Sequence, residues 1–153
     1  MDSLSSKVKI SYQITSEFSF VKGLKSIPSQ LMNIEGDLNI VINNQIFFEE
    51  PIALYEFYCY LDRWLYDWEK GHKISFEYVS MESEENPLLA FKLTTSGFQI
   101  FSVWQQYNSE EIFDTNDFKD YIALITGQIE KDIIHTFGEE YMNYKELLPI
   151  KKM

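Results

Sequence analysis

Alternation of apolar and polar residues near the start of the chain predicts strands, because successive side chains of a strand point to opposite faces. Residues 7–15 alternate in this way. Residues 17–21 continue the pattern, with Phe18 and Phe20 in phase. Residues 23–28 contain a glycine and a proline, both of which interrupt regular structure. We therefore expect two strands followed by a connection.

The next alternating stretch, residues 37–48, predicts a hairpin. Its midpoint is Asn43-Asn44, and asparagine tolerates the positive φ angles that a two-residue turn requires. Leu38, Ile40 and Ile42 alternate before this pair, and residues 46–48 form the returning arm after it.

The second half of the chain predicts three more strands. Residues 73–81 form one, and the acidic stretch 82–87 follows it as a loop. Residues 88–95 and 98–107 alternate on either side of a Ser-Gly pair and predict a second hairpin.

The first long helix is predicted from Pro51 to Gly71. Proline is tolerated in the first turn of a helix, and Glu49 and Glu50 would lie near the positive end of its dipole. Glycine is common just after the last turn. Apolar residues at helical spacing form the expected buried stripe: Leu54, Phe57, Tyr58, Leu61, Trp64, Leu65 and Trp68.

A second long helix is predicted after Asp114, which is suited to the N-cap, with Asp117 three residues further on. It should run to about Phe137 and close at Gly138. Its expected buried stripe consists of Phe118, Ile122, Ile125, Ile129 and Ile133. Residues 139–150 predict one further short helical stretch.

The order of elements is therefore strands, helix, strands, helix. Short turns between consecutive strands favour antiparallel pairing, and two amphipathic helices need one face of a sheet to cover their apolar stripes. We expect an α+β fold, a two-layer sandwich with a mainly antiparallel sheet of about five to seven strands packed by two long helices. At 153 residues the chain should form a single domain over residues 1–153.

Composition narrows the possible partners. Hydrophobic residues make up 45% of the chain, which argues against disorder. Its 13 Lys and Arg against 24 Asp and Glu give a formal charge of −11, the wrong sign for binding phosphates of nucleic acid or anionic membranes. The charge favours a basic protein partner. With one cysteine, no apolar segment at the N-terminus and no long apolar run, the chain is expected to be cytoplasmic.

No motif for catalysis, metal binding or cofactor binding is present. The sequence has no glycine-rich phosphate loop, no nucleophile elbow and no HExxH. His72 and His135 belong to no ligand set, and Cys59 lies in the middle of a predicted helix, where it should be a structural thiol. We therefore expect no catalytic residue, no metal and no cofactor, and a binding protein rather than an enzyme.

Two groups of residues are candidates for partner binding. Tyr55, Asp62 and Tyr66 lie on a stripe of the first helix beside its apolar face, and tyrosines mixed with acids suit protein recognition. These rings could equally complete the edge of the core. The second group is the acidic stretch, which could equally be a solvated loop; its candidates are Glu82, Glu84 and Glu85.

Three segments together resemble a known kind of protein. They are GDLNIVINNQIFFEEPIALYEFYCYLDRWL, FEYVSMESEENPLLAFKL and FQIFSVWQQYN, which lie between residues 36 and 108. In layout they resemble the small acidic immunity proteins of bacterial polymorphic-toxin systems. The resemblance implies a cytoplasmic, single-domain inhibitor that neutralises a cognate toxin by covering its active site. It assigns no individual residue.

Two other functions stay open from sequence alone. A phage-type counter-defence protein that mimics nucleic acid would need carboxylates in rows along one face. A small-ligand-binding domain would need a cavity with converging polar groups between sheet and helices.

Overall fold

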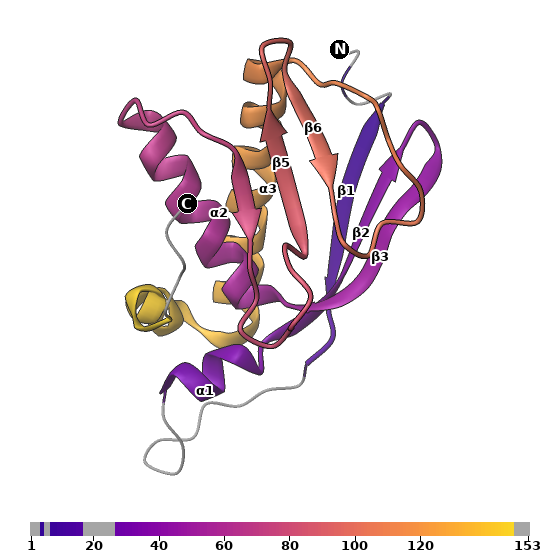
Figure 1. The fold of residues 1–153 in the computed structure, drawn as a ribbon. Coiled ribbons are helices and arrows are strands. Elements are labelled where there is room, and N and C mark those ends of the chain that lie inside the picture. The colour runs from indigo at the N-terminus through magenta and orange to yellow at the C-terminus, as the bar shows by residue number, and fades with distance from the viewer. Residues whose placement is uncertain (1–3, 5–6, 17–26, 149–153) are drawn as a thin grey trace.

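A computed structural model of the chain describes residues 4, 7–16 and 27–148. Its strands form two separate three-stranded antiparallel sheets, in the orders β1-β2-β3 and β4-β5-β6. The strands are β1 (Val8–Ile14), β2 (Glu35–Ile42), β3 (Gln45–Ala53), β4 (Phe76–Tyr78), β5 (Leu89–Leu93) and β6 (Phe98–Phe101). The helices are α1 (Ile27–Met32), α2 (Leu54–Glu69) and α3 (Thr115–Phe137), followed by the 3₁₀ helix η1 (Glu139–Leu147). Figure 1 shows their arrangement.

The α+β class is as expected, but the expectation of one sheet of about five to seven strands packed by two long helices is wrong. The two sheets stay separate because other segments occupy their edges. On β3, the carbonyl of Phe47 accepts a hydrogen bond at 2.8 Å from the amide of Gln106, in the loop after β6. On β6, Phe98 pairs through two 2.8 Å backbone hydrogen bonds with Phe113, just before α3.

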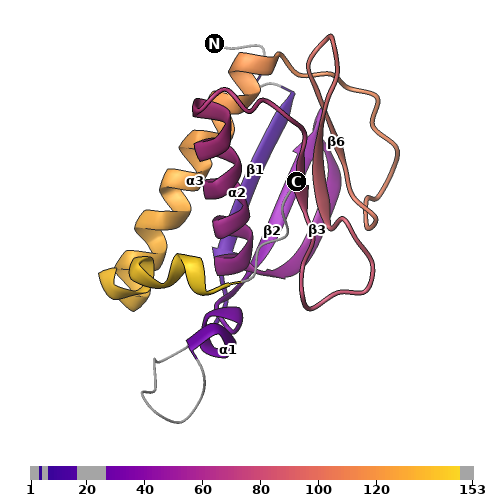
Figure 2. The same ribbon diagram turned by 60° about the vertical axis from the view of Figure 1, so that its left-hand side comes forward.

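The free edge of β1 is covered by α3. The backbone amide of Ile10 donates to the hydroxyl of Tyr121 at 2.9 Å, and the Tyr12 hydroxyl donates to the carboxylate of Asp132. Unpaired strand edges promote association with other chains. Side chains of a helix thus take the place of a fourth strand, and Figure 2 shows α3 running alongside β1.

The hairpin predicted over residues 37–48 is confirmed as β2 and β3. Asn43 and Asn44 form its turn with φ angles of 51° and 65°. The predicted helix start at Pro51 is wrong, because this residue lies in β3 opposite Asp37, and α2 begins at Leu54. β3 is an edge strand, where a missing N–H on the outer side interrupts no ladder, so the strand continues through the proline.

Several other expected boundaries change. Residues 17–21, expected as a strand, lie outside the described residues. Residues 23–28 were expected as a connection, but α1 begins at Ile27. The strand expected over 73–81 is limited to β4, and the arms of the second hairpin are shortened to β5 and β6. Its turn holds Gly97, as predicted.

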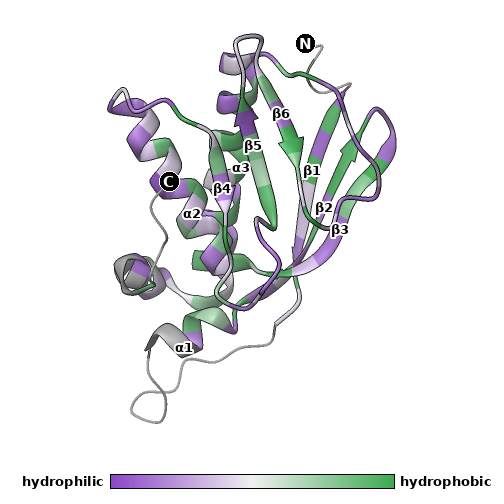
Figure 3. Cartoon of the chain, viewed as in Figure 1, coloured by the Kyte–Doolittle hydropathy of each residue, from purple (hydrophilic) through white to green (hydrophobic). Residues whose placement is uncertain are grey.

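A cluster of aromatic rings joins α2 and α3 to the second sheet. Trp64 on α2 has ring contacts with four neighbours, namely Trp68, Phe76, Phe91 and Phe98. Phe118 on α3 contacts the rings of Phe91 and Phe98 from its own side. In Figure 3 the apolar colouring dominates β5 and β6, whereas the tip of the β2–β3 hairpin is hydrophilic. The core therefore lies between the helices and the strands.

The predicted start, end and buried stripe of α3 are confirmed. Asp114 Oδ2 accepts a hydrogen bond at 3.0 Å from the amide of Asp117, which caps the helix. Gly138, with φ of 115°, follows its last residue. All five residues of the predicted stripe are buried: Phe118, Ile122, Ile125, Ile129 and Ile133.

The same substitution at two glycines should have opposite effects on stability. Gly97 has φ of 145°, and an added Cβ would lie 2.1 Å from the carbonyl oxygen of Phe113. We expect Gly97→Ala to lower the free energy of unfolding by about 1–3 kcal/mol through strain. Gly127 is helical and an added Cβ would meet nothing within 4 Å. Gly127→Ala should raise the free energy of unfolding by roughly 0.5–1 kcal/mol.

Urea denaturation followed by circular dichroism measures both changes. A midpoint of Gly97→Ala that is unchanged or raised would contradict the placement of Gly97 against Phe113, and a lowered midpoint of Gly127→Ala would contradict the open space at Gly127.

Candidate functional site

Between β4 and β5 lies an acidic loop, residues 80–87, that is folded on itself. The amide of Ser80 donates to Asn86 Oδ1 at 3.1 Å, and Asn86 Nδ2 donates to the carbonyl of Ser83 at 2.8 Å. Its exposed side chains are Met81, Glu82, Glu84 and Glu85. The sequence predicted the loop but not its internal hydrogen bonds. The structure brings the three candidate glutamates together on one short, ordered segment.

A buried carboxylate anchors this loop to α2. Glu56 is 1% exposed and lies in the first turn of the helix. It accepts hydrogen bonds from the hydroxyl of Tyr78 at 2.7 Å, the hydroxyl of Ser80 at 2.7 Å and the amide of Met81 at 3.1 Å. A buried carboxylate is stable only when hydrogen bonds replace its hydration. Glu56 therefore fixes where the loop leaves β4.

Ionisation of Tyr78 is suppressed at this anchor. Burial, and then the negative charge of Glu56, raise the pKa of Tyr78 well above its ordinary value. The phenol thus keeps its proton and remains a donor to the carboxylate. Burial and the nearby charges of Glu35 and Glu56 also raise the pKa of Glu82. Negative charge thus accumulates around the start of the acidic loop.

The loop contacts the β6–α3 connection, residues 102–114. Trp104 Nε1 donates to Glu85 Oε1 at 3.1 Å, and the amide of Val103 donates to the carbonyl of Pro87 at 3.3 Å. Val103 is 36% exposed and Met81 is 49% exposed. We define the acidic loop surface as six exposed or half-exposed side chains from these two segments: Met81, Glu82, Glu84, Glu85, Val103 and Trp104.

The other group of candidates does not form one exposed stripe. Tyr55 is fully buried, and its hydroxyl donates to the backbone carbonyl of Tyr141 in η1. Tyr55 therefore lies in the core, which agrees with the alternative that its ring completes the core edge. Asp62 is half-exposed and bound by Lys145 Nζ at 3.2 Å. Tyr66 is 60% exposed, with Lys70 Nζ 5.3 Å from its ring centroid.

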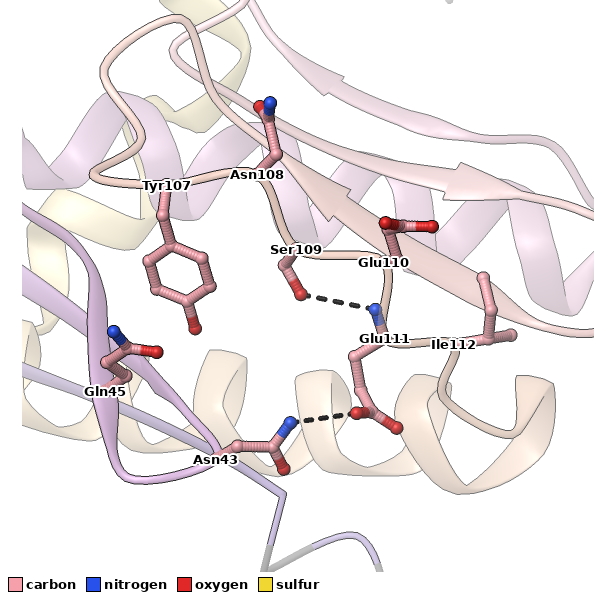
Figure 4. A pocket seen from close by; sticks show the side chains of 8 residues that line it. All are labelled: Asn43, Gln45, Tyr107, Asn108, Ser109, Glu110, Glu111 and Ile112. Carbon is pink, nitrogen blue, oxygen red and sulfur yellow. Dashed lines mark hydrogen bonds between the residues drawn. The ribbon is translucent and has the colours of Figure 1, made fainter.

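A pocket of about 450 Å³ lies between the β2–β3 turn and the β6–α3 connection. Figure 4 shows Tyr107 and Gln45 on one side of the open space and Ser109, Glu111 and Asn43 on the other. The remaining lining residues are Asn108, Glu110 and Ile112. Sequence reasoning missed this pocket, because its two walls are far apart along the chain and neither holds a motif.

Two contacts join the two walls of the pocket, and a third binds Glu111 to Lys7, just before β1. Glu111 Oε1 accepts from Asn43 Nδ2 at 2.8 Å, and Lys7 Nζ lies 3.1 Å from Glu111 Oε2. These two partners lower the pKa of Glu111, so its carboxylate stays charged. The hydroxyl of Tyr107 donates to the carbonyl of Ile42 at 3.0 Å.

The cysteine thiol and the two histidine imidazoles belong neither to the acidic loop surface nor to the lining of the pocket. Cys59 is buried in α2, and burial, together with the charge of Asp62, raises the pKa of its thiol. His72 and His135 are exposed. Among the described residues, no three His, Cys, Asp or Glu side chains are arranged as metal ligands. No helix in the described ranges combines the length and apolar character needed to cross a membrane.

The chain belongs to the family described as Domain of unknown function (DUF7878), which matches residues 10–135. The matched range includes both the acidic loop and the polar pocket. No curated protein and no solved structure matches the chain significantly.

Removing the anchor of the acidic loop should destabilise the protein and loosen the loop. Glu56→Ala leaves Tyr78, Ser80 and the Met81 amide without their acceptor, so we expect the free energy of unfolding to fall by about 2–4 kcal/mol. The Met81 amide should exchange its hydrogen faster. The control is Glu84→Ala, an exposed glutamate of the same loop, which should change stability by less than ~0.5 kcal/mol. Equal effects of the two variants would contradict the anchoring role.

Buried tyrosines predict loss of stability at alkaline pH. Burial raises the pKa values of Tyr55, Tyr58 and Tyr78 above the ordinary value of 10.0. A raised pKa in the folded state gives stability that is complete below the unfolded pKa and is lost as pH rises above it. The thermal unfolding midpoint should therefore fall between about pH 9.5 and about pH 11. A midpoint that stays constant across this range would contradict the burial of these phenols.

Proposed function

We propose that this protein is a protein-binding inhibitor, an immunity protein that neutralises a basic cognate toxin by covering the toxin's active site. The observation that carries the proposal is the acidic loop surface. It presents exposed Glu82, Glu84 and Glu85 on a loop held by buried Glu56. The proposal also rests on the resemblance to small acidic immunity proteins.

Preorganisation of the loop supports a binding role. Ordering of side chains and loops opposes association, so a loop that is ordered before contact binds more tightly than a flexible one. Here three hydrogen bonds hold the loop: Met81 to Glu56, Asn86 to Ser83, and Trp104 to Glu85. A solvated loop whose only role is connection does not require a buried carboxylate as its anchor.

Charge supports a basic partner. The chain carries a formal charge of −11, and Glu82 lies among like charges from Glu35 and Glu56. A Lys or Arg from a partner would relieve this repulsion, and the net charge would accelerate the encounter. Enzymes that act on phosphate-containing substrates bind them with Lys and Arg, so their active sites complement such a surface.

Apolar side chains on the same surface supply contacts that exclude water. Met81 and Val103 are exposed, and Trp104 is half-buried with its indole N–H already bonded to Glu85. Protein interfaces typically combine apolar or aromatic anchors with a polar rim. Methionine adapts its shape to the surface that it meets. We expect the carboxylates to set orientation and the apolar group to slow dissociation.

The first test is co-purification with the product of the adjacent reading frame, followed by an assay of that product's activity. We expect a one-to-one complex in which the partner is inactive. The triple variant Glu82→Gln, Glu84→Gln, Glu85→Gln should reduce the association rate constant at least ~10-fold and weaken its dependence on salt.

A matched control separates the loop from overall charge. Glu49→Gln, Glu139→Gln, Glu140→Gln removes the same number of exposed carboxylates at other positions. We expect this variant to bind within ~3-fold of the unaltered protein. Failure to find a partner would contradict the inhibitor proposal, and equal effects of the two triple variants would contradict the acidic loop surface as its site.

A further inference from the structure

We propose that the polar pocket beside the β2–β3 turn receives the guanidinium group of an arginine presented by the basic partner, an inference that rests on the proposed function. The pocket is open to solvent and lies on the same connection as Trp104. It therefore forms a second point of contact rather than part of the acidic loop.

Several groups around the pocket can accept hydrogen bonds from a ligand. In Figure 4 the hydroxyl of Tyr107, the amide of Gln45 and the hydroxyl of Ser109 surround the open space. The hydroxyl of Tyr107 donates its proton to Ile42, so its oxygen faces a ligand only as an acceptor. The hydroxyl of Ser109 accepts from the amide of Glu111 at 3.3 Å, so toward a ligand it offers one remaining lone pair as an acceptor and its own O–H as a donor. A ligand rich in N–H donors matches such a lining.

Charge at the pocket selects a cation. Among the described residues, its lining includes the carboxylates of Glu110 and Glu111 and no lysine, arginine or histidine. Lys7 lies behind Glu111, bound to Oε2 at 3.1 Å, and offsets one of the two charges. The remaining negative charge repels carboxylate and phosphate groups and attracts an ammonium or a guanidinium.

Shape favours guanidinium over ammonium. A guanidinium is planar, carries five N–H donors in a fixed fork and is more weakly hydrated than an ammonium, so it bonds to acceptors on two walls at once. The ring of Tyr107 adds a flat surface for stacking. Its orientation is fixed by an edge-to-face contact with Phe47, at 5.6 Å between centroids. The volume of about 450 Å³ also leaves room for the aliphatic stem of the side chain.

Contacts within the chain hold the walls of the pocket in place. Asn43 binds Glu111 across the opening, and the amide of Gln106, in the β6–α3 connection, donates to the carbonyl of Phe47 on β3 at 2.8 Å. The β6–α3 connection runs from Trp104, which contacts the acidic loop, to Glu111 at the pocket. A partner held at the acidic loop surface is thus brought to the same connection that lines the pocket.

A blocked amino acid tests the pocket without the partner. Nα-acetyl-L-arginine methylamide is titrated into the full chain and followed by nuclear magnetic resonance. We expect saturable shifts at the Gln45 side-chain amide and at Tyr107 and Ser109, with a dissociation constant of about 1–10 mM. The isosteric citrulline derivative lacks the charge and should bind at least ~10-fold more weakly. The lysine derivative should fall between them.

A double variant with a matched control locates the binding. The double variant Gln45→Ala, Glu110→Gln removes one acceptor and one negative charge from the pocket. Neither side chain makes a described contact that holds the pocket walls. The variant should weaken arginine binding at least ~5-fold. Gln128→Ala, Glu139→Gln makes the same changes at exposed positions on α3 and η1 and should leave binding unchanged. The affinity of both double variants for the partner protein is then measured.

The outcomes separate this inference from the proposed function. Equal binding of arginine and citrulline derivatives, or shifts confined to other residues, would overturn the guanidinium pocket even where the partner complex forms. A partner complex unaffected by Gln45→Ala, Glu110→Gln would overturn its role in that complex. If the arginine derivative binds the pocket but no basic partner is found, the proposed function fails and the guanidinium site stands.

Discussion

Burial of a helix on every side obliges each polar group on it to find a partner inside the protein, because water cannot reach it. Every residue of α2 from Leu54 to Leu61 is buried, and this stretch includes three tyrosines and a glutamate. The partners of those four groups determine the surrounding structure. Tyr55 binds η1, Tyr58 binds α3 through Glu130, Tyr60 binds the carbonyl of Val79, and Glu56 binds the acidic loop.

The elements that sequence predicted well depend on local rules. Asn43 and Asn44 make a turn because asparagine tolerates positive φ, and Asp114 caps α3 because its side chain reaches an amide three residues on. The single sheet failed because strand pairing is not local. The outer edge of β3 could pair with another strand or with the loop that holds Gln106. Which of these occurs depends on how distant segments of the chain fold back. The helix start predicted at Pro51 was wrong because proline is accepted both in an edge strand and in the first turn of a helix. Residue type alone does not distinguish these two positions.

In the candidate site too, some features could be predicted from sequence and others could not. Exposure of Glu82, Glu84 and Glu85 follows from their charge and could be expected from sequence. Burial of Glu56 could not, because glutamate is rarely buried and its donors come from β4 and the loop beyond it. For Tyr55 the sequence left a surface position and a core-edge position equally open, because tyrosine suits both a core edge and an interface. Only the fold distinguishes these uses.

Contacts within the chain cover three of the four sheet edges, and this has a consequence for how another protein recognises this one. Many complexes form when an extended segment adds to an open sheet edge and reads it through backbone hydrogen bonds. On β1 an amide of that edge is taken by Tyr121, on β3 a carbonyl is taken by Gln106, and β6 is paired with Phe113. A visiting strand would have to displace contacts already made within the chain. At these three edges recognition therefore falls to side chains, whose identity carries more selectivity than a backbone ladder that every sequence shares.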